Sequence, residues 1–121
     1  MLRTYDTLKG ERLDKAIAAS TAGANVLAPG KPDKCIICYS YWFVATTTVS
    51  VDLEDANGVV KAGPAPCADN GGLSATFNPR GWFILGPGVG LNVGLGGNVV
   101  VGGGFSGAYI SKEDAEQAQL K

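Results

Sequence analysis

The sequence predicts an all-β protein, built as an antiparallel β-sandwich or barrel, and three observations lead to that prediction. First, apolar and polar residues alternate in residues 46–54 and 89–95, which is the period of a strand with one buried face. Second, turn sequences containing Gly, Pro or Asn-Gly recur about every ten residues, a spacing typical of short strands joined by tight turns. Third, only residues 111–121 have the polarity and the start signal of a helix.

The expected strands follow one another along most of the chain. Residues 33–44 are rich in β-forming residues and apolar on both faces, as a central or interface strand would be. After strand 46–54, the sequence DANG at 55–58 predicts a hairpin, because Asn-Gly accepts the positive φ angles of a type I′ turn. The proline-containing segment 63–72 is expected to be a loop. The remaining strands are expected at residues 14–20, 59–62 and 73–77, and on both sides of the turn at 94–98.

The two ends of the chain do not fit the sheet pattern. Residues 1–13 are polar with scattered apolar side chains and are expected to form an N-terminal arm, which leaves 14–110 as the β-sandwich domain. Residues 111–121 are expected to form a short C-terminal polar helix or tail. There Ser111 followed by Asp114 resembles a capping box, in which side chains satisfy the free N–H groups of a helix start.

The stretch from residue 84 to 110 is glycine-rich and carries no charge. Its ten glycines, one proline and two asparagines make a poor transmembrane helix, and its period is that of a strand. Gly86, Gly88 and Gly90 imitate part of a dinucleotide-binding loop, but no helix follows whose N-terminus could hold a phosphate. Strands joined by turns are therefore the preferred interpretation.

Composition excludes several functional classes. Ten basic residues balance eleven acidic ones without a basic stripe, so no nucleic-acid partner is expected. The sequence contains no histidine, which removes the commonest general base and the commonest metal ligand. Three cysteines are sparse for a disulfide scaffold and suggest assembly in a reducing cytosol. The charged first residues lack the apolar core of a signal peptide. Without a histidine to act as a general base, no enzymatic activity is expected.

Cys35 and Cys38 form a C-x-x-C sequence inside a predicted strand. Positions three apart on a strand point to opposite faces, too far apart for a disulfide. A zinc site would need a second pair of ligands, and only Cys67 remains. We therefore expect two buried structural thiols, with no metal and no cofactor bound. Cys67 lies in the predicted loop and is expected to be partly exposed.

Two other clusters have both a functional and a structural interpretation. The acidic segment 52–58 could hold Ca²⁺, but it lacks the final glutamate of an EF-hand loop, and a hairpin tip explains it equally well. A carboxylate pair of a glycosidase is not excluded by spacing, although a chain this small leaves little room for a deep cleft. The aromatic run at 39–43 could stack on sugars, but packing in the core or between subunits is favoured.

The sequence NPRGWF at 78–83, followed by GPGVGLNVGLGGNVVVGG at 86–103, resembles a family of small β-sandwich proteins of tailed bacteriophages and prophages. Residues 33–62 fit the same pattern, so the resemblance covers residues 14–110. The best-understood members are jelly-roll cement, or decoration, proteins, which trimerise on the outside of an icosahedral head. The resemblance thus implies a jelly-roll-like sandwich and a homotrimer. The cysteines and the charged tail depart from the family pattern.

The leading hypothesis is a structural virion protein. As a capsid cement protein it would bind the outer surface of a phage head as a homotrimer, after assembly in the host cytoplasm, and stabilise contacts between subunits of the major capsid protein. No membrane partner is expected. The alternative is a carbohydrate-binding jelly-roll module of a tail fibre or baseplate, stacking sugars on Tyr41 or Trp42. Aromatic residues exposed in a groove would favour this alternative.

Two sets of contact residues follow from the leading hypothesis. The N-terminal arm mixes basic and apolar side chains, so it can order on a partner's surface through many weak contacts. The expected capsid contacts are Leu2, Arg3, Tyr5, Leu8, Lys9 and Arg12. The expected trimer contacts are Tyr39, Tyr41, Trp42 and Phe43.

Overall fold

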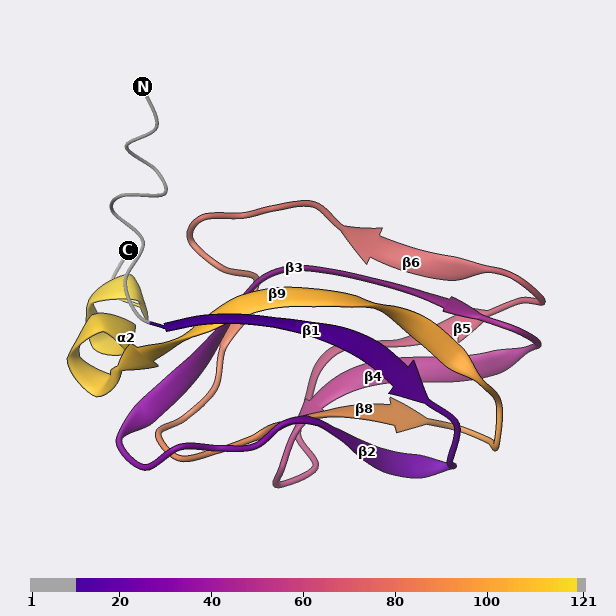
Figure 1. The fold of residues 1–121 in the computed structure, drawn as a ribbon, viewed down its shortest axis with the longest axis horizontal. Helices are drawn as coiled ribbons and strands as arrows, with labels where there is room; N and C mark the ends of the chain where they lie inside the picture. Colours follow the sequence, from indigo (N-terminus) through magenta and orange to yellow (C-terminus); the bar gives the residue numbers. More distant parts are fainter. Residues whose placement is uncertain (1–10, 120–121) are drawn as a thin grey trace.

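The computed structural model describes residues 11–119 as two antiparallel sheets packed face to face, with one helix at the C-terminal end (Figure 1). In sheet A the strand order is β1-β9-β3-β6, and the two-residue β7 also pairs with β3. In sheet B the order is β2-β8-β4-β5. The predicted all-β antiparallel sandwich is therefore confirmed. The bounds in sheet A are β1 Glu11–Ala19, β3 Lys34–Ala45, β6 Gly72–Ala75, β7 Phe83–Ile84 and β9 Val101–Ser111. Those in sheet B are β2 Gly23–Ala28, β4 Val49–Asp55, β5 Val60–Cys67 and β8 Leu91–Leu95.

The hydrophobic core lies between the two sheets and follows the alternation in the sequence. Val49, Val51 and Leu53 of β4 are buried, while the residues between them are more exposed. In β8 the buried side chains again include every second residue, as predicted. Apolar side chains of β1, β3 and β9 close the core from the opposite sheet. Each strand thus buries one face because its apolar residues recur with the period of the pleat.

Strand β3 is apolar on both faces because each face is covered by a different part of the same chain. Its pairing with β9 shifts between Cys38 and Ser40, so that Tyr39 is the extra residue of a β-bulge. Cys38 and, after the bulge, Phe43 face the core between the sheets. On the outer face, Cys35 and the residues near it pack under helix α2 (Lys112–Gln119) and beside Ile84. Of the two interpretations of this strand, central or interface, the first half of its outer face fits the central one, because the chain's own helix covers it.

Three segment boundaries differ from the sequence-based expectation. Strand β1 begins at Glu11, so 11–13 belong to the sandwich rather than to the arm. The segment expected to be a loop from residue 63 continues β5 as far as Cys67, whose side chain is buried. Its prolines are tolerated because β5 is an edge strand, and Gly63, at φ 93°, fits the irregular pairing with β4. Strand β2 was not expected, since its alternation is weak.

The predicted hairpin and helix start are confirmed, but the turn is not of type I′, because Gly58 has a positive φ (85°) and Asn57 does not. Asp55 accepts hydrogen bonds from the backbone N–H groups of Asn57 and Val59, both at 2.9 Å, which closes the hairpin between β4 and β5. Ser111 Oγ accepts a hydrogen bond from the N–H of Asp114 at 3.1 Å and so caps α2. Within the part of the chain that the structure describes, no helix is long and apolar enough to cross a membrane.

Candidate functional site

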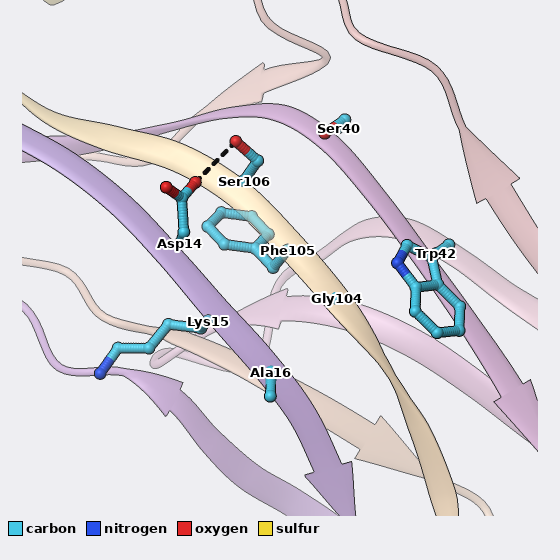
Figure 2. Close-up of a pocket in the computed structure, with 8 residues that line it drawn as sticks. All are labelled: Asp14, Lys15, Ala16, Ser40, Trp42, Gly104, Phe105 and Ser106. Carbon is cyan, nitrogen blue, oxygen red and sulfur yellow. Dashed lines mark hydrogen bonds between the residues drawn. The ribbon is translucent and has the colours of Figure 1, made fainter.

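An open groove crosses the outer face of sheet A. It has a volume of about 380 Å³ and is lined by residues of β1, β9 and β3 (Figure 2). Its lining residues are Asp14, Lys15, Ala16, Ser40, Trp42, Gly104, Phe105 and Ser106. The groove therefore has an aromatic end at Trp42 and a polar end at Asp14 and the two serines.

The groove exists because small residues lie beside a tryptophan across three paired strands. The register places Ala16 of β1 opposite Gly104 of β9, and Gly104 opposite Trp42 of β3. A Cβ atom added to Gly104 would lie 2.8 Å from Nε1 of the Trp42 indole. The indole thus leans over the backbone of β9, where only glycine leaves room for it. Its other side remains open, and 52% of Trp42 is exposed.

The polar end of the groove is held by a short hydrogen-bond chain. Ser106 Oγ donates to Asp14 Oδ1 at 2.8 Å and accepts from Arg12 Nη2 at 2.9 Å. Arg12 Nη2 also lies 3.3 Å from Asp14 Oδ1. This ion pair is exposed and contributes little to stability, but together with Ser106 it fixes the direction of the carboxylate. Figure 2 shows Asp14 and Ser106 bonded to each other across β1 and β9.

The structure brings only some of the predicted contact residues to a surface. Trp42 lies in the groove, whereas Tyr39 and Phe43 are each only 2% exposed and are not available to a partner. Tyr41 packs against the core and stacks on Phe43, with ring centroids 6.1 Å apart. Arg12 lies at the polar end of the groove. The other five expected capsid contacts lie outside the described residues: Leu2, Arg3, Tyr5, Leu8 and Lys9.

A second surface follows the β3–β6 edge of sheet A and the connection from β6 to β7. We call it the apolar edge, and its exposed members are Val44, Leu73, Phe77 and Trp82. Val44 and Leu73, together with Trp42, line a hollow of about 230 Å³. Further along, the Trp82 indole N–H donates to the carbonyl of Thr76 at 2.8 Å, which fixes the ring although half of it is exposed. In the sequence, Trp82 stands out only as part of NPRGWF at 78–83.

The three cysteines are buried free thiols, not joined by disulfides, and their pKa values are raised. Desolvation raises the pKa of Cys38 to about 12. Burial also raises the pKa of Cys67, and that of Cys35, where Glu116 adds to the effect and Lys112 opposes it. Cys35 and Cys38 belong to clusters on opposite faces of sheet A, as predicted. Cys67 was expected to be partly exposed, but its side chain is buried.

We expect the three thiols to react slowly in the native protein. Because the thiolate is the reactive form, a raised pKa and a buried sulfur both slow attack on a disulfide reagent. Dithionitrobenzoate should therefore titrate three thiols rapidly in denaturant and far more slowly without it. Rapid reaction of one native thiol would show that its surroundings are more open than described.

A pair of carboxylates lies on the outer face of sheet B. Asp52 and Glu54 of β4 lie beside Gly94 of β8, whose absent side chain leaves room for both. Asp52 Oδ1 is buried without a hydrogen-bond partner among the described residues. Desolvation raises the pKa of Glu54, and Asp52 raises it further by accepting its proton in a hydrogen bond and by its charge. No group of three or more potential metal-binding side chains occurs among the described residues.

We expect Glu54→Gln to stabilise the protein at neutral pH. A raised folded-state pKa means that the protonated carboxyl stabilises the fold below its ordinary pKa of 4.5, and that this contribution is lost as pH rises through the folded-state pKa. Glutamine resembles the protonated form at every pH. Urea unfolding should therefore show a gain for the variant at pH 7 that vanishes near pH 4. A loss of stability at pH 7 would mean that the two carboxylates do not repel each other.

Comparisons with known proteins identify no relative that would assign either surface. No protein-family model matches the chain, and no curated protein or solved structure matches it.

Proposed function

We propose that the protein is a structural virion component, a cement protein that binds the outside of a phage head as a homotrimer. The observation that carries the proposal is the apolar edge. Its four side chains, Val44, Leu73, Phe77 and Trp82, are each more than 40% exposed along the β3–β6 edge and the connection that follows β6. Exposed apolar side chains that gather on one surface mark sites of protein association. The partners would be two further copies of this chain and the major capsid protein, with assembly in the host cytoplasm.

The backbone at this edge also suits association. Strand β6 pairs only with β3 and is four residues long, so its outer N–H and C=O groups are not used in the sheet. Sheet edges of this kind readily pair with another chain unless they are short or covered. A neighbouring copy that packed on the apolar edge would cover both the aromatic side chains and these backbone groups.

The order of strands supports the jelly-roll part of the proposal. Most successive strands lie in different sheets, and the orders β1-β9-β3-β6 and β2-β8-β4-β5 place the first strand beside the last. Two nested Greek keys produce such an order, and jelly rolls of this kind occur in viral capsid proteins. A structural rather than catalytic role also agrees with thiols of raised pKa and with a carboxylate pair that lies on an open sheet face.

Sedimentation equilibrium at micromolar concentration tests the trimer. We expect a species of three times the 12.4 kDa chain mass. Leu73→Glu, which places a charge on the apolar edge, should shift the protein to monomer, because an unpaired charge is costly to bury in an interface. Val26→Glu is the matched control, since Val26 is exposed on β2, at the far edge of sheet B. A monomeric wild-type chain, or equal effects of the two variants, would contradict the proposal.

A carbohydrate-binding module of a tail fibre or baseplate is the second candidate function. The observation that favours it is the half-exposed Trp42 in the groove, beside a carboxylate and two hydroxyls. The two surfaces adjoin at Trp42, which borders both the groove and the hollow of the apolar edge.

A further inference from the structure

We propose that the groove on sheet A binds one pyranose ring of a neutral glycan. The ring's C–H face would lie on the Trp42 indole, and its hydroxyls would reach Asp14, Ser106 and Ser40. This inference does not depend on the trimer, because the apolar edge supplies the trimer contact. The groove's volume of about 380 Å³ lies near the lower end of the ~300–1,000 Å³ range of small-molecule sites, which suits a single ring better than a long chain.

Trp42 has the properties of a stacking platform. One side of its indole is held against β9, because the ring occupies the space above Gly104. About half of the side chain is exposed, and it lines both the groove and the hollow beside Leu73. The indole N–H donates no hydrogen bond to any residue in 11–119, so it remains available to a ligand hydroxyl. A tryptophan with a fixed ring, an open face and an available donor is suited to a ligand that is apolar on one face and polar at its rim.

The floor and the polar end complete the site. Beside the indole, Ala16 of β1 presents only a methyl group, so a sugar ring does not meet a bulky side chain there. Beyond it, Asp14 Oδ1 is bonded to Ser106 and Arg12, while its second oxygen takes part in no hydrogen bond within the described residues. A carboxylate held by two donors is a strong acceptor for sugar hydroxyls because it is already oriented. Ser40, from β3, adds a hydroxyl on the far side of β9 (Figure 2).

The charges favour a neutral glycan over an acidic one. The Asp14 carboxylate is aimed at the groove, and the guanidinium of Arg12 is engaged with Asp14 and Ser106. Lys15 is the other cation near the groove, and Figure 2 shows its ammonium group pointing away from Trp42. An anionic sugar on the indole would therefore meet a carboxylate before it met a free cation.

The first test is a glycan array probed with the intact chain, with neutral and acidic glycans printed side by side. We expect binding to a set of neutral glycans that share one terminal sugar. Binding of no glycan, or of acidic glycans alone, would overturn the proposal. The methyl glycoside of the shared sugar then serves as the probe in solution.

The second test locates the sugar with a matched pair of tryptophan variants. The chain has two tryptophans of similar exposure, 52% for Trp42 and 50% for Trp82. In the Trp82→Phe variant, Trp42 is the single tryptophan, and its fluorescence should change saturably with the methyl glycoside at an unchanged Kd. Trp42→Ala and Asp14→Asn should each weaken binding about tenfold or more, measured by ligand-observed NMR. Circular dichroism confirms that each variant is folded.

Two variants distinguish the glycan-binding proposal from the trimer proposal. Asp14→Asn should leave the sedimentation behaviour unchanged while glycan binding falls, because Asp14 lines the groove and not the hollow at the apolar edge, and Leu73→Glu should do the reverse. Glycan binding by Trp42→Ala at the wild-type Kd would overturn the groove proposal and leave the apolar edge untouched.

Discussion

Replacing Gly103 with alanine should destabilise the sandwich by about 3 kcal/mol, because the new methyl group would collide with backbone rather than with a movable side chain. A Cβ atom at Gly103 would lie 2.0 Å from the carbonyl oxygen of Trp42 and 2.8 Å from the Cα of Phe43. Strands β3 and β9 form the middle of sheet A, so neither can move aside without disturbing its other neighbour. The two strands must therefore separate locally and lose some of the hydrogen bonds that pair them.

The adjacent Gly102 provides the matched control. A Cβ atom there would meet nothing closer than the carbonyl oxygen of Ile17 at 3.8 Å, which is ordinary contact. Gly102→Ala should change the free energy of unfolding by less than about 1 kcal/mol, since it also reduces the freedom of the unfolded chain. Urea denaturation of both variants measures the difference. Equal stabilities for the two variants would show that β3 and β9 are not packed as closely as described.

Deleting residues 1–13 should cost about 3 kcal/mol more than deleting residues 1–10. The longer deletion removes Leu13, which is 6% exposed in the core, and the first three pairs between β1 and β9. It also removes Arg12 from the polar end of the groove. The expected role of the N-terminal arm in capsid binding therefore has to be tested by deleting residues 1–10, so that loss of capsid binding is not confused with loss of the fold.

Leu13→Ala in the full-length chain separates the core contribution from the backbone pairing. It should account for a large part of the difference between the two deletions, because a buried leucine leaves a cavity when it is truncated. Thermal unfolding of the three proteins checks this. If both deletions lowered stability equally, residues 11–13 would contribute nothing to the sandwich.

The sequence predicted those strands that have one apolar and one polar face. In β4 and β8 the alternation is regular, so the period alone identifies the strand and its buried side. In β5 the prolines suggested a loop, because composition does not show that a strand will be at the edge of a sheet, where a missing N–H is harmless. In β3 the apolar outer face suggested a partner copy, but helix α2 covers part of it.

The groove could not be predicted because it depends on pairing between distant residues. Ala16, Trp42 and Gly104 come together only when β1 and β3 pair with opposite sides of β9. In the sequence, Trp42 is one of four aromatic residues in the run at 39–43, and nothing in that run separates it from the other three. The bulge at Tyr39 changes which residues of β3 face outward. As a result the three other aromatic side chains pack within the protein, and Trp42 is the one exposed in the groove. Such a bulge has no sequence signal in this strand.

A cryo-EM reconstruction of the particle whose genome encodes this chain tests the cement proposal most directly. We predict density for the two-sheet sandwich on the outer surface of the head, in groups of three, with the apolar edges of neighbouring copies in contact and the Trp42 grooves exposed. A particle with bare heads, or one that carries the sandwich only on its tail, would contradict the account.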